Sequence, residues 1–169
     1  MGLKKLLVDV PALIESGVKA DQIECEYLFH RNNKGTFSLL EVAQFAAYCR
    51  QCTDSFCIDA CPKEALERQE NGTIKRLNMR CVGCKSCILA CPFGTIFPEV
   101  INYVSSKCDF CLNQLKDNPD YIPACAKTAP ENTIIMKEIE EELPDEYIYF
   151  YGDHLAIKNP SWLRKEARA

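Results

Sequence analysis

The chain has 169 residues, which is the size of one domain or two small lobes. Its net charge is −4 and its basic residues are scattered, so it lacks the basic patch expected of a nucleic-acid-binding protein. No apolar run reaches the roughly 18 residues of a spanning helix, and Asp9 and Pro11 interrupt the only stretch resembling a secretory signal, so we expect a cytoplasmic protein without a transmembrane segment. The chain has twelve cysteines but no secretory signal, which argues against a set of disulfides. The cysteines are closely spaced, as expected for residues that surround a bound group.

The first expected elements are a strand and a helix. Residues 3–10, LKKLLVDV, are predicted to form an opening strand. Residues 38–49, SLLEVAQFAAYC, are predicted to form a short helix that runs into the first cysteine run. Between them lie Cys25 and His30, of which the histidine is expected to be structural.

Two cysteine runs follow, separated by a predicted hairpin strand at residues 71–77, NGTIKRL. The first run has the pattern C-x2-C-x4-C-x3-C-P and comprises Cys49, Cys52, Cys57 and Cys61. The second has the pattern C-x2-C-x2-C-x3-C-P and comprises Cys81, Cys84, Cys87 and Cys91. The second pattern is typical of bacterial ferredoxins, in which three thiolates hold one [4Fe–4S] cluster and the fourth reaches to another. Short helical turns are expected around these cysteines.

Paired runs of this kind predict crossed ligation, because a tight loop wraps three corners of a cube and a proline after the fourth cysteine turns the chain away. We expect cluster one to be held by Cys49, Cys52, Cys57 and Cys91. We expect cluster two to be held by Cys81, Cys84, Cys87 and Cys61. Zinc is the main alternative, although knuckles for structural zinc are usually spaced farther apart.

A third run departs from the pattern at its fourth position. It reads C-x2-C-x13-C-x3-A-P and comprises Cys108, Cys111 and Cys125, with Ala129 where a fourth cysteine is expected. In a crossed pair, loss of that cysteine implies that the partner run has lost its own cluster. Counting back from Cys25 at ferredoxin spacing puts Glu15, Val18 and Asp21 where three thiolates would stand.

Cys25 is then positioned to be the retained fourth ligand of the third run. We expect cluster three to be held by Cys108, Cys111, Cys125 and Cys25, which uses all twelve cysteines in three [4Fe–4S] clusters. One alternative is a three-cysteine [3Fe–4S] cluster beside a buried Cys25 thiol. Another is a fourth ligand from His30 or an aspartate.

Residues 136–169 carry no cysteine and are expected to form a C-terminal extension. Residues 138–154 combine an acidic run with an aromatic strand candidate, and residues 159–169 are predicted to begin a last helix. Because aromatic side chains are enriched at interface cores, we expect this extension to dock on a partner, unless its aromatic residues pack on the cluster-binding domain, residues 1–135.

The predicted fold is α+β and bacterial ferredoxin-like, of the 2[4Fe–4S] type, with two pseudo-symmetric cluster-binding lobes of short hairpins and helices. Little apolar core is expected, so the apoprotein should be poorly folded. Four basic residues flank the second run and either raise the potential of a nearby cluster or are surface charge. They are Lys75, Arg76, Arg80 and Lys85.

The three runs resemble the electron-transfer subunits of the four-cluster ferredoxin family. The similarity spans residues 48–134 and rests on YCRQCTDSFCIDACPKEAL, RCVGCKSCILACPFGTI and KCDFCLNQLKDNPDYIPACAKTAPENTI. Members accompany molybdenum or tungsten bis-pterin oxidoreductases, formate dehydrogenases, hydrogenases and dimethyl sulfoxide reductases. The resemblance implies ligation between runs one and four and between runs two and three; this chain departs by lacking one cluster. Within the family it is similar to the small iron–sulfur subunits of tungsten-dependent benzoyl-CoA reductases.

No residue set outside the cysteines has the spacing of an acid/base pair, an activated nucleophile or a phosphate loop. We therefore expect a non-catalytic subunit of anaerobic metabolism that relays single electrons to or from a catalytic redox subunit. The resemblance implies a tungsten or molybdenum pterin partner, such as benzoyl-CoA reductase, together with further electron-donor subunits. The alternatives are a free, diffusing ferredoxin and an interaction module built on zinc or structural clusters.

Overall fold

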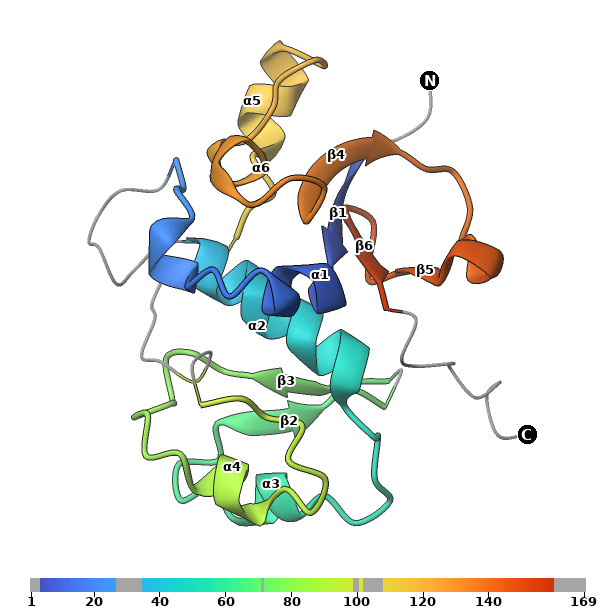
Figure 1. Ribbon diagram of the computed structural model, residues 1–169. Helices are drawn as coiled ribbons and strands as arrows, with labels where there is room; N and C mark the ends of the chain where they lie inside the picture. Colours follow the sequence, from blue (N-terminus) through green and yellow to red (C-terminus); the bar gives the residue numbers. More distant parts are fainter. Residues whose placement is uncertain (1–3, 27–34, 71, 99–100, 102–107, 160–169) are drawn as a thin grey trace.

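The computed structural model describes residues 4–26, 35–70, 72–98, 101 and 108–159, which form short strands, short helices and one longer helix (Figure 1). The strands are β1 (Lys4–Asp9), β2 (Leu66–Arg68), β3 (Ile74–Arg76), β4 (Ile134–Glu138), β5 (Ile148–Phe150) and β6 (Leu155–Lys158). The helices are α1 (Val10–Glu15), α2 (Gly35–Tyr48), α3 (Phe56–Asp59), α4 (Ser86–Ala90), α5 (Leu112–Asp117) and α6 (Ala124–Thr128), with 3-10 turns η1 (Ala20–Gln22) and η2 (Pro144–Glu146).

The larger sheet joins the two ends of the described chain. Its strand order is β4-β1-β6-β5, with β1 antiparallel to β4 and parallel to β6. Leu6 at the centre of β1 lies opposite Met136 on one side and Leu155 on the other. The run Leu6, Leu7 and Val8 is buried throughout, as expected for a central strand covered on both faces.

Helix α2 lies between this sheet and the smaller β2–β3 hairpin (Figure 1). Leu39, Leu40 and Ala43 belong to the core beneath the larger sheet. Phe45 belongs to a second core with Leu66 and other residues near the hairpin. A helix that is apolar on several sides is expected to be buried, and α2 fits that expectation.

The part of the molecule beyond α2 contains the hairpin and two short helices, α3 and α4, which lie against each other (Figure 1). The two strands pair from Leu66 opposite Arg76 to Arg68 opposite Ile74. Helices α5 and α6 lie on the other side of α2, near the larger sheet (Figure 1). The cysteine runs are therefore divided between the two sides of one central helix.

Several sequence-based predictions are confirmed. The opening strand, the helix at 38–49, the hairpin strand and the aromatic strand candidate correspond to β1, α2, β3 and β5, with α2 beginning earlier, at Gly35. The mixture of helices and strands agrees with an α+β fold. Pseudo-symmetry between two lobes stays a prediction. None of the described helices is long and apolar enough to cross a membrane.

Two expectations about the core and the C-terminal segment require correction. The expected scarcity of apolar core is wrong, because β1, β6, α1 and α2 enclose a conventional buried cluster. The expected division after residue 135 falls inside β4, and β6 pairs with β1 over four residues, so residues 136–158 complete the main sheet. The helix predicted at 159–169 lies outside the described residues except for Asn159, whose side-chain amide donates to the Ala47 carbonyl at 2.9 Å.

Candidate metal centres

Four cysteines from the first two runs surround one pocket, which we call site one. They are Cys49, Cys52, Cys57 and Cys91. Cys49 follows the last residue of α2, Cys57 is the second residue of α3, and Cys91 directly follows α4. Burial raises the pKa of the Cys57 thiol to about 11, with further contributions from the neighbouring Cys49 and Cys91 charges. The thiols are therefore close enough to influence one another.

The two extra residues in the first run are fixed by an arginine from the hairpin. The Arg68 guanidinium donates hydrogen bonds to the Cys52 carbonyl and the Ser55 hydroxyl, and to the Thr53 carbonyl at 3.3 Å. Arginine suits this role because it carries five donors in a rigid fork. This contact connects the loop before α3 to β2 and was not predicted from the sequence.

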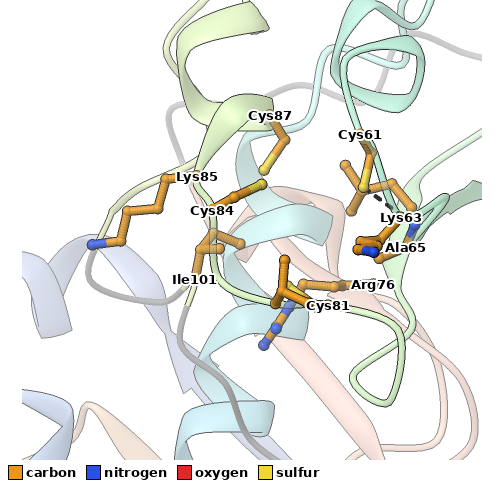
Figure 2. A pocket seen from close by; sticks show the side chains of 11 residues that line it. Cys61, Lys63, Ala65, Arg76, Cys81, Cys84, Lys85, Cys87 and Ile101 are labelled. Carbon is orange, nitrogen blue, oxygen red and sulfur yellow. Dashed lines mark hydrogen bonds between the residues drawn. The ribbon is translucent and has the colours of Figure 1, made fainter.

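A second group of four cysteines, which we call site two, surrounds another pocket (Figure 2). Its members are Cys61, Cys81, Cys84 and Cys87. Burial raises the pKa of the Cys87 thiol, and the charges of Cys81 and Cys61 add to the effect. The Ala65 N–H donates to Cys61 Sγ at 3.2 Å, so the backbone supports a charged sulfur here.

The remaining four cysteines form site three, between α2 and the α5–α6 region. They are Cys25, Cys108, Cys111 and Cys125. Burial raises the pKa of the Cys108 thiol to about 12, with contributions from the charges of Cys125, Cys25 and Cys111. Burial likewise raises the pKa of Cys125 to about 11, and Cys25 is the next contributor. The structure thus brings the earliest cysteine to the third run.

Local contacts keep Cys25 at this site. The N–H of Glu24 donates to Thr128 Oγ1 on α6 at 2.9 Å, and the Thr36 hydroxyl on α2 donates to the Glu24 carbonyl at 3.3 Å. A Cβ added to Gly35 would lie 3.3 Å from Cys25 Sγ and 3.4 Å from the Cys108 Cα. The absence of a side chain at Gly35 therefore allows Cys25 and Cys108 to lie close to the first residue of α2.

Each of the three C-x2-C segments contains the same kind of backbone turn. The residue before the second cysteine has a positive φ in each: 52° at Gln51, 69° at Gly83 and 55° at Phe110. Two of these residues are not glycine, so the turn is held by its surroundings at some conformational cost. The third run is thus a structural copy of the others as well as a sequence copy.

Ala129 occupies the backbone position of a fourth cysteine. Helices α4 and α6 each have five residues and carry a cysteine as the second; Cys91 follows the first helix as Ala129 follows the second. The N–H of Ala129 donates to the Cys125 carbonyl, as that of Cys91 donates to the Cys87 carbonyl. Three residues further on, φ is again positive after each run: Glu64, Gly94 and Asn132.

The segment expected to have lost its cysteines lies beside a cavity. Val18 and Asp21 line a space of about 630 Å³ between the segment after α1 and one side of α2. Val18 and Ala129 pack against the same hydrophobic core cluster. Glu15 ends α1 and is exposed.

The donor sets fit iron–sulfur cubanes better than single ions. Each of the twelve cysteines is a free thiol. Among the described residues, no three Cys, His, Asp or Glu side chains converge closely enough to hold one metal ion. At sites one and two, four cysteines line a shared pocket, which suits a larger body than a single ion, and [4Fe–4S] clusters are held by four cysteine thiolates. His30 lies outside the described residues, and the His154 ring lies 5.9 Å from that of Phe110.

The four basic residues near the second run differ in their surroundings. Arg80 and Lys85 are exposed and Lys75 is partly exposed, which fits surface charge. Arg76 is buried and pairs with Glu41 of α2. Neither this pair nor the role of Gly35 was predicted, because each depends on contacts between elements distant in sequence.

Cysteine groups of this geometry and spacing define an iron–sulfur protein. Residues 40–139 match the family model described as the 4Fe-4S dicluster domain, and the chain belongs to that family. This membership supports [4Fe–4S] clusters, rather than zinc, as the cofactor type.

Several known proteins with similar sequences are named as ferredoxin-like or electron-transfer proteins. The chain is 34% identical over 112 residues to the uncharacterized ferredoxin-like protein YdhX of Escherichia coli O157:H7, covering 63% of this chain and 50% of the relative. It is 28% identical over 140 residues to the thiosulfate reductase electron transfer subunit PhsB of Salmonella typhi, covering 81% and 67%. It is 35% identical over 95 residues to the electron transport protein HydN of Escherichia coli K12, covering 47% and 53%. The chain spans about half the length of the curated relatives that it matches.

Proposed function

We propose that this chain is an electron-transfer subunit with three [4Fe–4S] clusters, one at each site, which relays single electrons to or from a catalytic partner. The observation that carries the proposal is the gathering of all twelve cysteines into three groups of four. Bound clusters supply reversible one-electron chemistry at potentials that the protein adjusts.

The proposed ligands follow the three groups. Cluster one takes Cys49, Cys52, Cys57 and Cys91. Cluster two takes Cys81, Cys84, Cys87 and Cys61. Cluster three takes Cys108, Cys111, Cys125 and Cys25. The high thiol pKa values at sites one and three mean that assembly near neutral pH releases protons, since the metal requires thiolates.

Loss of a fourth cluster accounts for two features at once. The backbone at Ala129 supports its origin as a fourth-cysteine position. Cys25 is then the fourth cysteine of the lost run, and in the crossed pattern it still serves the cluster of the third run. The cavity beside Val18 and Asp21 is consistent with a vacated site.

A catalytic partner is supported by the relatives' names and by apolar side chains exposed near sites one and two. Phe56 and Phe93 line the site-one pocket yet are 55% and 57% exposed, and Leu89 on α4 is 90% exposed. Exposed apolar side chains next to a redox centre suit docking against another subunit. A tungsten or molybdenum pterin enzyme such as benzoyl-CoA reductase is the proposed partner, on the resemblance of the cysteine runs, and a cytoplasmic location stays a prediction.

Anaerobic copurification from native cells tests this function. We expect the chain to elute with a larger subunit, and metal analysis of the complex to find iron together with tungsten or molybdenum. Elution as a monomer with a full cluster complement would instead support a free ferredoxin. Clusters that no dithionite treatment reduces would support a structural role.

A further inference from the structure

A buried ion pair connects the central helix to the wall of site two. Arg76 on β3 donates from Nε to Glu41 Oε1 at 2.7 Å and from Nη2 to Glu41 Oε2. The side chains are 1% and 5% exposed, respectively. Such a two-point contact fixes the orientation of the guanidinium group.

The third guanidinium nitrogen takes no part in the pair with Glu41. Among the described residues, Arg76 Nη1 is buried and has no hydrogen-bond partner. Although burial opposes the shift, Glu41 and, to a smaller extent, the neighbouring Cys81 raise the pKa of Arg76. Arg76 lines the site-two pocket, where Figure 2 shows its side chain beside Cys81. The positive member of the pair therefore lies beside a proposed cluster ligand, whereas Glu41 is not among the residues that line the pocket.

Stability alone does not explain this arrangement. Taking two charges out of water costs several kcal/mol per ion, and apolar residues of similar volume often serve as well or better. Apolar side chains already line the same pocket at Leu66 and Ile101. A buried cation beside a ligand sulfur has a definite effect on a centre that gains negative charge upon reduction.

We propose that Arg76 raises the electron affinity of the cluster at site two, and that Glu41 moderates this effect while holding the guanidinium in place. The inference rests on the proposed function, since it requires a cluster at that site. Uptake of one electron from a donor such as dithionite adds one negative charge to the cluster, and no bond forms or breaks in Arg76. The nearby cation stabilises the reduced state more than the oxidised state.

Removing the charge of Arg76 and removing the charge of Glu41 should shift the midpoint potential of the site-two cluster in opposite directions. Arg76→Gln removes the positive end of the pair and lowers the midpoint potential of the site-two cluster. Glu41→Gln keeps the cation and removes its counter-charge, and so raises that potential. A purely structural pair predicts no such opposition, because loss of either partner disturbs the same contacts.

The test is an EPR-monitored potentiometric titration of the full, cluster-loaded chain. We expect Arg76→Gln to lower, and Glu41→Gln to raise, the electron affinity of one cluster by at least tenfold, which is about 59 mV for one electron. The cluster is assigned to site two by the EPR signal that Cys84→Ser alters. Lys75→Gln is the matched control. It removes an equal charge next to Arg76 from a residue that forms a partly exposed ion pair with Glu67, and it should leave all midpoint potentials unchanged.

Shifts of the same sign in both variants, no shift, or a shift no larger than that of Lys75→Gln would overturn the inference. If Arg76→Gln fails to assemble its clusters, Glu41→Gln decides alone: an upward shift supports the inference, and any other result contradicts it. Iron and sulfide content of the unaltered chain tests the proposed function separately, because missing clusters there would refute the function rather than the role of Arg76.

Discussion

At the scale of single residues, Gly35 determines how closely Cys25 and Cys108 of site three approach the start of α2. The Cβ of an alanine would lie 3.3 Å from Cys25 Sγ, which is closer than ordinary van der Waals contact. A sulfur bound to a cluster cannot move away as a free side chain can. The choice of glycine at the first residue of α2 is thus explained by the proposed cluster site rather than by the needs of the helix.

Gly35→Ala should therefore weaken assembly at site three. We expect a loss of up to one cluster, roughly four iron per chain, with sites one and two retained. Overpacking of this kind costs on the order of 1–3 kcal/mol. Iron analysis with EPR of the reduced protein checks this, and full occupancy of all sites would show that the contact relaxes without consequence.

At the scale of elements, the repeated run is the unit that explains Ala129. Helices α4 and α6 have the same length, the same cysteine position and the same hydrogen bond at their ends. The residue after the helix is a cysteine in one case, Cys91, and an alanine in the other, Ala129. A cysteine at 129 would restore one ligand, but Glu15, Val18 and Asp21 would still supply no thiolates.

Ala129→Cys should consequently leave the iron content unchanged and add one reactive thiol. Lys127→Cys, on an exposed position of the same helix, is the control for an added thiol without a ligand position. Thiol titration and iron analysis make the comparison. An increase of about four iron in Ala129→Cys alone would refute the idea that a whole site has been lost.

The sequence predicts elements and cysteine groups well where the signal is local. Spacing within residues 81–91 is sufficient to indicate a ferredoxin run, and the Asn-Gly turn signal at residues 71–72 is sufficient to indicate a hairpin strand. The pairing of β6 with β1 has no local signal, because it joins residues about 150 positions apart. The same holds for the burial of Arg76, which looks like surface charge in a basic segment until Glu41 is found opposite it.

At the scale of the whole molecule, the charges around the sites differ in sign. Arg76, Lys63 and Lys85 line site two. At site three, burial raises the pKa of Cys111 to about 12, and Asp109 and Glu26 contribute to the shift. Negative neighbours oppose a further electron, whereas positive neighbours favour it.

We therefore expect site two to be reduced at a higher potential than site three. A stepwise potentiometric titration followed by EPR checks the order, with Cys84→Ser and Cys25→Ala used to assign the signals. Reduction of site three first would mean that hydrogen bonding or solvent exposure outweighs these charges.

The apolar core changes the expected behaviour of the apoprotein. Leu6, Val8, Leu39 and Leu155 belong to a buried cluster that contains none of the proposed ligands among its fully buried members. Removal of iron with a chelator should therefore disorder the cysteine loops but preserve the main sheet and α2. Circular dichroism should retain helix and strand signals with a cooperative thermal transition, and complete loss of both would show that the clusters are required for the core.

The central claim is that three [4Fe–4S] clusters are bound and that Cys25 completes the third. Iron and acid-labile sulfide, measured per chain in anaerobically prepared protein and in Cys25→Ala, test it most directly. We predict roughly twelve iron in the unaltered chain, and a loss of about one to four iron in the variant, with a [3Fe–4S] EPR signal if the cluster persists. About eight iron in the unaltered chain, or identical iron content and spectra in both proteins, would contradict the account.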